Sequence, residues 1–483
     1  MDNILALLAR QGAVIERLTS DSRRVAPGAA FFAWPGGAAD GRRYIAQAIE
    51  RGCAAVLWES EGFAWDGGWK APNAGVKDLK SQAGFLAHEF NGRPSESLWI
   101  CGVTGTNGKT SCSQWLAALL SRRNEKAAVI GTLGAGFPSN LISIENTTPD
   151  ALELQRLLAE FKSAGASVVA MEVSSHGLDQ GRVNGVAFDC ALFTNLTHDH
   201  LDYHGTMAAY AEAKARLFNA PGLAAAVLNL DDPFGAQLAK RLAARGVRTI
   251  GYGLSKSDAD VSEFVFAESI EGKQVTIHSS WGRARAEIPQ LGRFNVSNAL
   301  GVLGCLVAKG IAFEEGVRLL EVLPQVAGRM QQIGDRPLVV VDYAHTPDAL
   351  DKVLSALKPV AQARGGRLVA VFGAGGGRDK AKRPVMGSVA AARADRIVLT
   401  SDNPRGEDPQ AIVEAIRDGV SGDCVVELDR AKAIDSAIGS AAAADVVLIA
   451  GKGHEAFQEI AGRRLPFSDA AVAGAALGRR GNR

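Results

Sequence analysis

The pattern of apolar and polar positions changes twice along the chain. Residues 1–97 carry short apolar runs, such as AAFFAWP at 29–35 and CAAVLW at 53–58, between turns rich in glycine and proline. These runs predict a small α/β domain. The polar segment NGRPSES at 91–97 is expected to be the linker that closes it.

Residues 98–328 alternate apolar strands with helices. The expected strands lie in 98–105, 167–174, 190–197 and 225–230, and the expected helices include 110–123 and 207–218. Near-continuous apolar runs are typical of parallel strands that are covered on both faces. The pattern predicts a doubly wound α/β domain, with QVAGRM at 325–330 as its exit. The apolar stretch at 299–313 is interrupted by Lys309 and glycines, so we expect a buried helix there.

A second α/β alternation occupies residues 329–483. The segments 337–346, 367–380, 396–405 and 445–455 each begin as an apolar strand and turn polar at once. Ligands of open α/β sheets bind at the carboxyl ends of the strands. We therefore expect one site at one sheet edge, formed by Asp342, His345, Arg378, Asp379, Asp402, Arg405, His454 and Glu455.

Composition narrows the class of protein. The chain has 53 Lys and Arg against 52 Asp and Glu, and this balance argues against a nucleic-acid-binding surface. Its six cysteines are scattered and form no C-x-x-C pair, which favours a reducing cytoplasm over a disulfide framework. The start of the chain lacks a signal-peptide layout, and no apolar run is long enough to span a membrane. We expect a cytoplasmic protein.

The segment GVTGTNGKTS at 102–111 follows an apolar strand and opens a helix. Glycines let the backbone N–H groups fold around phosphates, and the helix N-terminus adds favourable partial charge. Lys109 can reach the terminal phosphates of a nucleotide, and the Thr110 hydroxyl suits Mg²⁺. The spacing departs from G-x-x-x-x-G-K-T because Val103 stands where the first glycine is expected.

Two further polar segments follow strands. Glu172 lies in an apolar run, where a carboxylate is costly unless it is paired or bound to a metal. The segment 194–206 contains a cluster suited to a metal or phosphate, and without cysteines Mg²⁺ is the better choice. Lys214, in an expected helix, is by itself typical of an ordinary surface lysine. The cluster consists of His198, Asp199, His200, Asp202 and His204.

Eight motifs together resemble the Mur ligase family, in the family's order and over nearly the whole chain. The resemblance is greatest to members that add the third amino acid to UDP-N-acetylmuramoyl-L-alanyl-D-glutamate. It implies a UDP-substrate-binding domain at 1–97, an ATP-binding domain at 98–328 and a Rossmann-like, amino-acid-binding domain at 329–483. The motifs are GTNGKT, EVSSHGL, TNLTHDHLDYHGT, GRFNVSNAL, DYAHTPDAL, GGGRDKAKRP, SDNPR and AGKGHE.

The resemblance also implies roles for single residues. Lys214 matches the lysine that the family carbamylates with CO₂, and its carbamate would complete a Mg²⁺ shell with Thr110, Glu172 and His200. The expected catalytic groups are Lys109, Lys214, Glu172 and His200. Positions matching the UDP-substrate site are Ser22, Asn146, Thr147, Thr148, Ser174, Gln180 and Arg182. Positions matching the ATP site are Gly105, Thr106, Asn107, Gly108, Lys109, Thr110, Asn295, Asn298, Arg329 and Asp342.

The segment DNPR at 402–405 resembles the signature of members that add diaminopimelate. An arginine fork binds a carboxylate with two parallel hydrogen bonds, and lysine lacks the distal carboxylate of diaminopimelate. Asp402 and Asn403 are expected to offer acceptors to the distal ammonium. The full set expected to bind diaminopimelate is Arg378, Asp402, Asn403, Arg405, Gly451 and Glu455.

The implied activity is an ATP-dependent amide ligation through an acyl phosphate. Its partners would be ATP, the UDP-linked dipeptide and meso-diaminopimelate, with Mg²⁺ and CO₂ as cofactors and a monomeric chain. Four alternatives stay open: the same ligase using L-lysine, a folylpolyglutamate-synthetase-like ligase, a phosphate-loop switch or motor ATPase, and an inactive UDP-sugar-binding protein.

Overall fold

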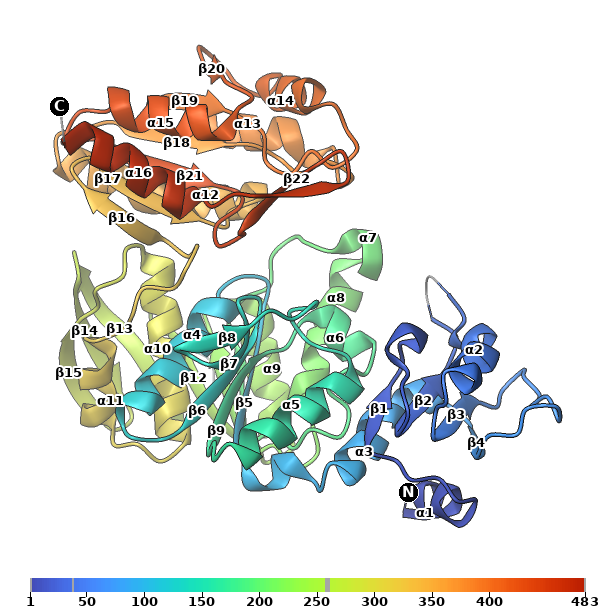
Figure 1. Ribbon diagram of the computed structural model, residues 1–483. Helices are drawn as coiled ribbons and strands as arrows, with labels where there is room; N and C mark the ends of the chain where they lie inside the picture. Colours follow the sequence, from blue (N-terminus) through green and yellow to red (C-terminus); the bar gives the residue numbers. More distant parts are fainter. Residues whose placement is uncertain (1, 37–38, 257–260, 482–483) are drawn as a thin grey trace. The chain divides into compact units, whose positions relative to one another are not determined.

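The computed structural model describes residues 2–36, 39–256 and 261–481 of the chain (Figure 1). These residues form two compact units. The first comprises Met1–Gly251, Asp258–Phe264 and Gly304–Ile311, and the second comprises Tyr252–Ser257, Val265–Leu303 and Ala312–Arg483. The expected domain limits at 97/98 and 328/329 do not coincide with these divisions, and they stay a prediction.

A small parallel sheet opens the first unit. Its strands run in the order β1 (Arg17–Thr19), β2 (Ala29–Ala33), β3 (Ala55–Glu59) and β4 (Asn73–Val76). Neighbouring β2 residues point to opposite faces, so Phe31 and Phe32 enter two separate cores. The helices of this part are α1 (Asp2–Arg10), α2 (Ile45–Glu50) and α3 (Leu79–Phe90).

The expected linker at 91–97 is a packed turn. It contains the 3-10 helix η3 (Pro94–Ser97), in which Pro94 and Ser95 are buried. The Ser95 hydroxyl accepts a hydrogen bond from the backbone N–H of Ala187 at 3.1 Å. Two residues of the expected linker therefore pack within the unit, and its role as a connector between domains stays a prediction.

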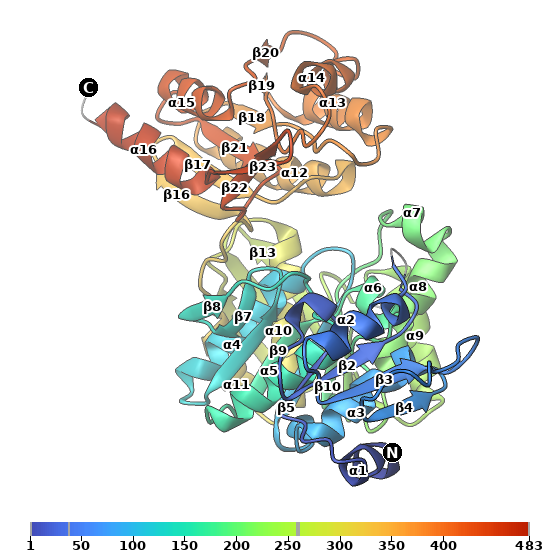
Figure 2. The same ribbon diagram turned by 45° about the vertical axis from the view of Figure 1, so that its right-hand side comes forward.

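A parallel sheet forms the centre of the first unit. Its strands run in the order β11 (Ala225–Asn229), β10 (Cys190–Phe193), β5 (Trp99–Thr104), β9 (Val168–Glu172) and β6 (Ala127–Gly131). Figure 2 labels the strands β5, β9 and β10 of this sheet. All four expected strands are confirmed. The antiparallel β7 (Gly134–Phe137) and β8 (Asn140–Ile142) extend the β6 edge, and the helices include α4 (Lys109–Arg122), α5 (Ala151–Ser163), α6 (Ser175–Asp179), α7 (Leu201–His204), α8 (Met207–Ala215) and α9 (Pro233–Ala243).

All six cysteines are free thiols, as the sequence predicts. Three of them gather in the first unit, where the Sγ atoms of Cys101 and Cys305 lie 3.8 Å apart beside Cys190. Within the described ranges, no helix is both long and apolar enough to cross a membrane.

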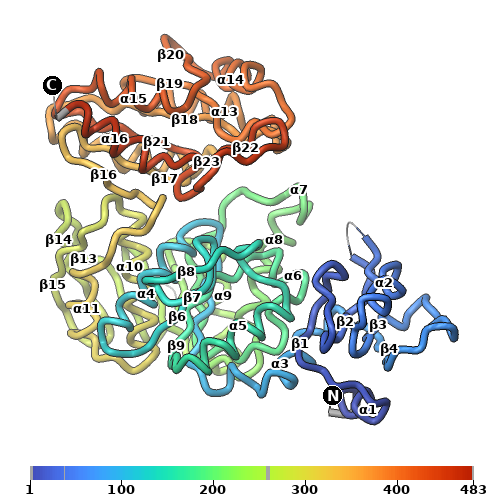
Figure 3. Tube along the Cα trace, in the orientation of Figure 1, coloured from blue at the N-terminus to red at the C-terminus, as the bar shows by residue number. Residues whose placement is uncertain are grey.

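The second unit contains a six-stranded sheet (Figure 3). Its order is β16 (Gln331–Asp335), β17 (Leu338–Asp342), β21 (Val446–Ala450), β18 (Leu368–Phe372), β19 (Arg396–Leu399) and β20 (Val425–Val426), parallel except for β16. The four expected strands are adjacent, so their carboxyl ends meet at one edge as predicted. One face packs on α12 (Pro347–Ala363), α13 (Lys382–Arg393) and α14 (Pro409–Arg417), and the other on α15 (Arg430–Ser440) and α16 (Asp469–Gly481).

Several elements have no counterpart in the sequence-based prediction. They are β12 (Arg248–Gly253), the antiparallel strands β13 (Glu263–Glu271), β14 (Gln274–Ser279) and β15 (Gly282–Glu287), and the hairpin of β22 (Phe457–Ile460) and β23 (Arg463–Pro466). Charged residues interrupt the apolar alternation in β13, β15 and β23. The expected helix at 299–313 is in fact the end of α10 (Arg293–Ala308), a short loop and the start of α11 (Phe313–Leu320).

Candidate active site

The phosphate-binding loop lies between β5 and α4. Gly105 has φ +146°, and a Cβ there would lie 1.9 Å from the Thr194 hydroxyl, so only glycine fits. Gly108 has φ +88° directly before the helix. The backbone N–H of Asn107 donates to the Asn195 side chain at 3.0 Å, and Lys109 Nζ donates to the carbonyls of Gly105 and Thr106, both at 2.8 Å. Contacts within the protein therefore hold the loop in this shape.

Glu172 is the buried acceptor beside this loop. Its side chain is 1% exposed and accepts hydrogen bonds from the Thr110 hydroxyl at 3.0 Å and from the N–H and hydroxyl of Thr132 at 2.8 and 3.1 Å. These bonds explain how a carboxylate is tolerated in an apolar strand. Thr132 was not among the expected site residues, and its hydroxyl also lies 3.1 Å from that of Thr147.

Lys214 is almost fully buried, at 1% exposed, so the expectation of an ordinary surface lysine is wrong. Its Nζ donates to the Gly105 carbonyl at 2.9 Å and lies 4.4 Å from the centre of the Tyr210 ring. Burial, followed by the nearby charge of Lys109, lowers the pKa of Lys214 well below its ordinary value. The neutral amine is the form that reacts with CO₂, so this environment favours carbamylation.

The histidine cluster is only partly assembled. The ring of His200 packs edge-on against that of His176, with centroids 4.8 Å apart, and desolvation of the ring lowers the pKa of His200 to about 4 although 45% of its side chain is exposed. His200 is therefore neutral near pH 7, the form that can bind a metal. His204 instead pairs with the Ser175 hydroxyl at 3.0 Å, and His198 is exposed.

Four of the expected UDP-substrate residues form one network. Arg182 donates to the Gln180 side chain at 2.7 and 3.0 Å and to the Thr148 carbonyl at 2.8 Å. The Thr148 hydroxyl donates to Ser174, which caps α6. Ser22 is buried in the 3-10 helix η1 (Ser22–Arg24) of the small sheet region, and Asn146 lies in the loop before α5.

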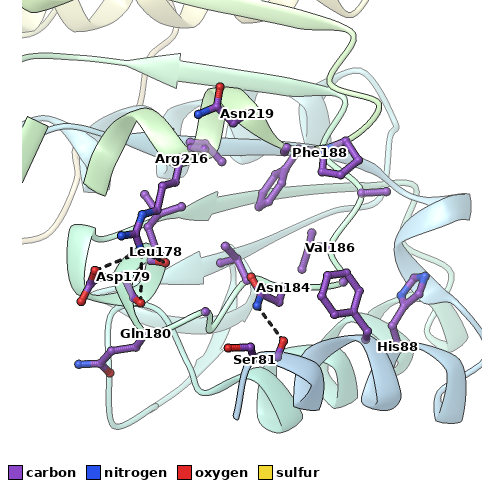
Figure 4. A pocket seen from close by; sticks show the side chains of 18 of the residues that line it. Ser81, His88, Leu178, Asp179, Gln180, Asn184, Val186, Phe188, Arg216 and Asn219 are labelled. Carbon is purple, nitrogen blue, oxygen red and sulfur yellow. Dashed lines mark hydrogen bonds and ion pairs between the residues drawn. The ribbon is translucent and has the colours of Figure 1, made fainter. Parts of the chain in front are cut away.

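A separate pocket of about 720 Å³ lies between α3 and the chain around α6 (Figure 4). Figure 4 shows Arg216 facing Asp179, their ion pair being 3.1 Å long, and Asn184 donating to the Ser81 carbonyl. Gln180 lines this pocket, whereas Lys109, Glu172 and Lys214 do not. This pocket is thus distinct from the phosphate-binding loop.

The remaining expected ATP residues lie in the second unit. Asp342 accepts hydrogen bonds from the backbone N–H groups of Met330 at 2.7 Å and Ala344 at 2.8 Å, and burial raises its pKa. The Arg329 guanidinium stacks 4.7 Å from the Tyr343 ring centre. On α10, Asn298 donates to the Asn295 side chain at 3.4 Å. The structure brings Arg329 and Asp342 together, and a role of all four toward ATP stays a prediction.

The DNPR turn follows β19 at the polar sheet edge. Arg405 has φ +53° and pairs with the β22 hairpin, because its N–H donates to Glu459 O at 3.0 Å and its carbonyl accepts from Ala461 N at 2.7 Å. Its Nη1 donates to the Gly376 carbonyl at 2.6 Å. Gly451 has φ +115°, and a Cβ there would lie 2.4 Å from Asp402 Oδ2, so the close approach requires glycine.

The expected acceptor role of Asn403 needs correction. Its Oδ1 already accepts hydrogen bonds from Lys452 Nζ and from the backbone N–H of Glu459, both at 2.9 Å. Its Nδ2 donates to Glu455 Oε2 at 2.8 Å. An amide oxygen has two lone pairs, so no acceptor remains for a substrate ammonium. Arg378, by contrast, is exposed in the loop after β18.

Two buried cations support this edge, and neither was expected. Arg430 pairs with Asp469 at 2.7 Å, both side chains being 0% exposed, and donates to the carbonyls of Ser401 and Ala450 at 3.2 and 2.9 Å. These carbonyls precede Asp402 and Gly451. Lys452 is the second cation. Both cations lie far from the DNPR turn in sequence, and no motif surrounds Arg430. The sequence therefore did not indicate that they contact this edge of the sheet.

Models of the Mur ligase family match three parts of the chain. The description "Mur ligase family, catalytic domain" applies to residues 14–89, "Mur ligase middle domain" to residues 103–306, and "Mur ligase, glutamate ligase domain" to residues 328–453. Together they confirm the expected order of three α/β domains.

Individual relatives agree with the family models. A UDP-N-acetylmuramoyl-L-alanyl-D-glutamate–2,6-diaminopimelate ligase of Chromobacterium violaceum is 50% identical, covering 98% of this chain and 96% of the relative. A solved structure of a ligase of the same name is 38% identical with a TM-score of 0.69, covering 97% and 95%. The folylpolyglutamate synthase of Mycobacterium tuberculosis, complexed with ADP and AMPPCP, is 18% identical with a TM-score of 0.61, covers 82% and 95%, and shares the fold alone. Because half of all residues are shared with the first relative over almost the entire length, this chain belongs to the Mur ligase family.

Proposed function

We propose that this chain is an ATP-dependent amide ligase that joins meso-diaminopimelate to the D-glutamate of UDP-N-acetylmuramoyl-L-alanyl-D-glutamate. This reaction belongs to the synthesis of peptidoglycan precursors. The names of the relatives support it. The observation that carries it is the sheet edge where Asp402, Asn403, Arg405, Gly451 and Glu455 lie together, because it offers charges of both signs to a substrate with two amino-acid ends.

In the first step, a carboxylate oxygen of D-glutamate attacks the γ-phosphorus of ATP, and ADP leaves. Both reactants are anionic, so the barrier depends on positive groups placed before the reaction starts. Lys109 and the N–H groups at the start of α4 supply them. The product is an acyl phosphate.

In the second step, the amine of meso-diaminopimelate attacks the acyl carbon, and inorganic phosphate leaves. Water would hydrolyse the acyl phosphate, so the site must exclude it while the amine arrives. The amino-acid edge contributes by holding the substrate in one orientation, which converts the encounter into an intramolecular reaction. Arg405 and Arg378 bind its carboxylate in this proposal, and Asp402 and Glu455 bind its ammonium.

We infer that Glu172 and its neighbour Thr110 hold a Mg²⁺ ion, with His200 as a further ligand. Thr110 and Glu172 provide oxygen donors 3.0 Å apart, and His200 is neutral near pH 7. Lys214 as an ammonium would repel the ion, whereas its carbamate would be an anionic oxygen ligand. When bound, Mg²⁺ offsets the charge of the phosphates. Carbamylation by CO₂ and the Mg²⁺ site are parts of the proposal.

The proposal has three further parts. The domains have limits 1–97, 98–328 and 329–483. The UDP-linked dipeptide binds to Ser22 and to the network around Thr148 and Arg182. Asn295, Asn298, Arg329 and Asp342 bind ATP. The chain acts as a monomer in the cytoplasm, where its nucleotide substrates are made.

An amine-specificity assay tests the proposal. The protein is supplied with ATP, Mg²⁺ and the UDP-linked dipeptide, and phosphate release and product mass are compared for meso-diaminopimelate and L-lysine. We expect a product carrying meso-diaminopimelate and little reaction with lysine. Preference for lysine would retain the ligase and overturn its substrate. Phosphate release that no amine stimulates would overturn amide ligation and favour a switch or motor ATPase.

A further inference from the structure

Lys452 is a buried cation directly after β21, with a side chain that is 0% exposed. Its Nζ donates to Glu455 Oε2 at 2.7 Å and to Asn403 Oδ1 at 2.9 Å. A buried ammonium is costly unless charged and polar partners surround it. Both of these hydrogen-bond partners belong to the expected amino-acid site, so the position of this cation concerns substrate binding more than general packing.

The neighbours of Asn403 allow only one orientation of its amide. Two donors, Lys452 Nζ and the backbone N–H of Glu459, face Oδ1, and an acceptor, the Glu455 carboxylate, faces Nδ2. Rotating the amide by half a turn would set its N–H groups against an ammonium and a backbone N–H, and its oxygen against a carboxylate. The hydrogen-bond partners alone therefore determine which end of the Asn403 amide is the oxygen and which is the nitrogen.

This orientation determines what Asn403 offers to a ligand. Both lone pairs of Oδ1 are used, and one of the two hydrogens on Nδ2 is used by Glu455. Among the described residues, the second N–H has no bonded partner. Asn403 can thus donate one hydrogen bond, and it stands two residues before Arg405, whose guanidinium carries further donors. A carboxylate matches this pair of donors.

We propose that Lys452 is a positioning residue that makes Asn403 a hydrogen-bond donor to the carboxylate of the amino-acid substrate. This inference rests on the proposed function and adds a specificity determinant to it. Lys452 also holds the Glu455 carboxylate close to Asn403. The N–H donor of Asn403 and the carboxylate of Glu455 therefore keep fixed positions relative to each other. A substrate without the distal carboxylate, such as lysine, gains nothing from this arrangement.

Lys452→Met tests the inference, because methionine fills a similar volume without donors or charge. We expect the KM for meso-diaminopimelate to rise roughly 10–100-fold, the loss typical of a hydrogen bond to a charged group. The KM values for ATP and the UDP-linked dipeptide should stay within about twofold, since those ligands do not contact the amide. The preference for meso-diaminopimelate over L-lysine should fall.

Two variants separate positioning from stability. Lys452→Gln keeps one N–H donor for Asn403, so its KM for meso-diaminopimelate should lie between those of the wild type and Lys452→Met. Leu354→Ala removes a fully buried side chain from the core of the same unit, and it should lower Tm without changing that KM.

The outcomes distinguish the inference from the proposed function. A wild-type protein that makes no product from meso-diaminopimelate would overturn the proposed function. An active wild type with an unchanged KM in Lys452→Met, or a KM raised equally for all three substrates, would overturn the role of Lys452 alone. The side-chain amide signals of Asn403 in an NMR spectrum give a readout that needs no turnover. They should shift in Lys452→Met and not in Leu354→Ala.

Discussion

The pKa of a buried cation is shifted in opposite directions in the two candidate sites. In the first unit, Lys214 is 1% exposed and its hydrogen bond goes to the carbonyl of Gly105, and burial lowers its pKa. In the second unit, burial by itself would lower the pKa of Arg430, but the carboxylate of Asp469 outweighs it and raises the pKa. Similar burial gives opposite results because only one of the two cations faces a carboxylate.

This difference separates a reactive site from a preassembled one. A lysine with a lowered pKa is partly neutral, and it can be modified or can respond to an arriving phosphate. Paired cations such as Arg430 and Lys452 are held in place and orient their neighbours. We therefore expect substitutions in the first site to reduce the reaction rate, and substitutions behind the second site to reduce stability or substrate affinity.

The largest expected effect is on stability, from Arg430→Met. This change leaves the carboxylate of Asp469 buried without its partner, which costs about 3–5 kcal/mol. Hydrogen exchange of β19 and β21 measures the loss of unfolding free energy. Lys352→Met, which removes a half-exposed pair with Asp348, should cost less than about 1 kcal/mol. Similar losses in the two variants would contradict the idea of a preassembled edge.

Lys109→Ala should act on the rate instead. Removing one preorganised donor to the reacting phosphate should lower kcat by ~10²–10³. Steady-state kinetics at saturating substrates measure the effect, and thermal unfolding should show a change in Tm close to zero. Lys162→Ala, an exposed lysine on α5, serves as the control. Turnover close to that of the wild type would remove Lys109 from the mechanism.

Removal of CO₂ should reveal the modification of Lys214. Activity in rigorously degassed buffer should fall by roughly tenfold or more, the range lost when partners of a metal shell are removed. Added bicarbonate should restore it, and mass spectrometry under mild conditions can detect the carbamate. Lys214→Met should be inactive with or without bicarbonate. An enzyme that is indifferent to CO₂ would show that Lys214 acts as an amine.

The smallest expected effect is a pH dependence of stability in the second unit. Burial, then the charges of Arg329 and Lys452, lowers the pKa of His454 to about 4 from an ordinary value of 6.5. The unfolded chain therefore binds the proton more readily between these values, so the contribution of His454 to stability is full above pH 6.5 and is lost as pH falls toward 4. His454→Gln should flatten this slope in urea titrations, whereas the exposed His345→Gln should not.

Local patterns predicted much of the fold. The four strands that end at the amino-acid edge are apolar runs followed by polar residues, and all four were placed correctly. The β22 hairpin was missed, because charged residues such as Arg463 and Arg464 mask its alternation and its pairing with Arg405 joins residues distant in sequence. Helix limits near 308–313 shifted for a different reason, because a continuous apolar run does not show where it bends.

The sequence by itself determined the family, the phosphate-binding loop and the set of chemical groups at the strand ends. The glycine-rich loop before Lys109 and the DNPR turn after an apolar strand are both visible in the sequence itself. Only the tertiary structure decided the electrostatic state of these groups. Burial of Lys214, the lowered pKa of His200 and the orientation of the Asn403 amide depend on atoms far away in sequence, and a pKa or a hydrogen-bond direction is a property of such surroundings.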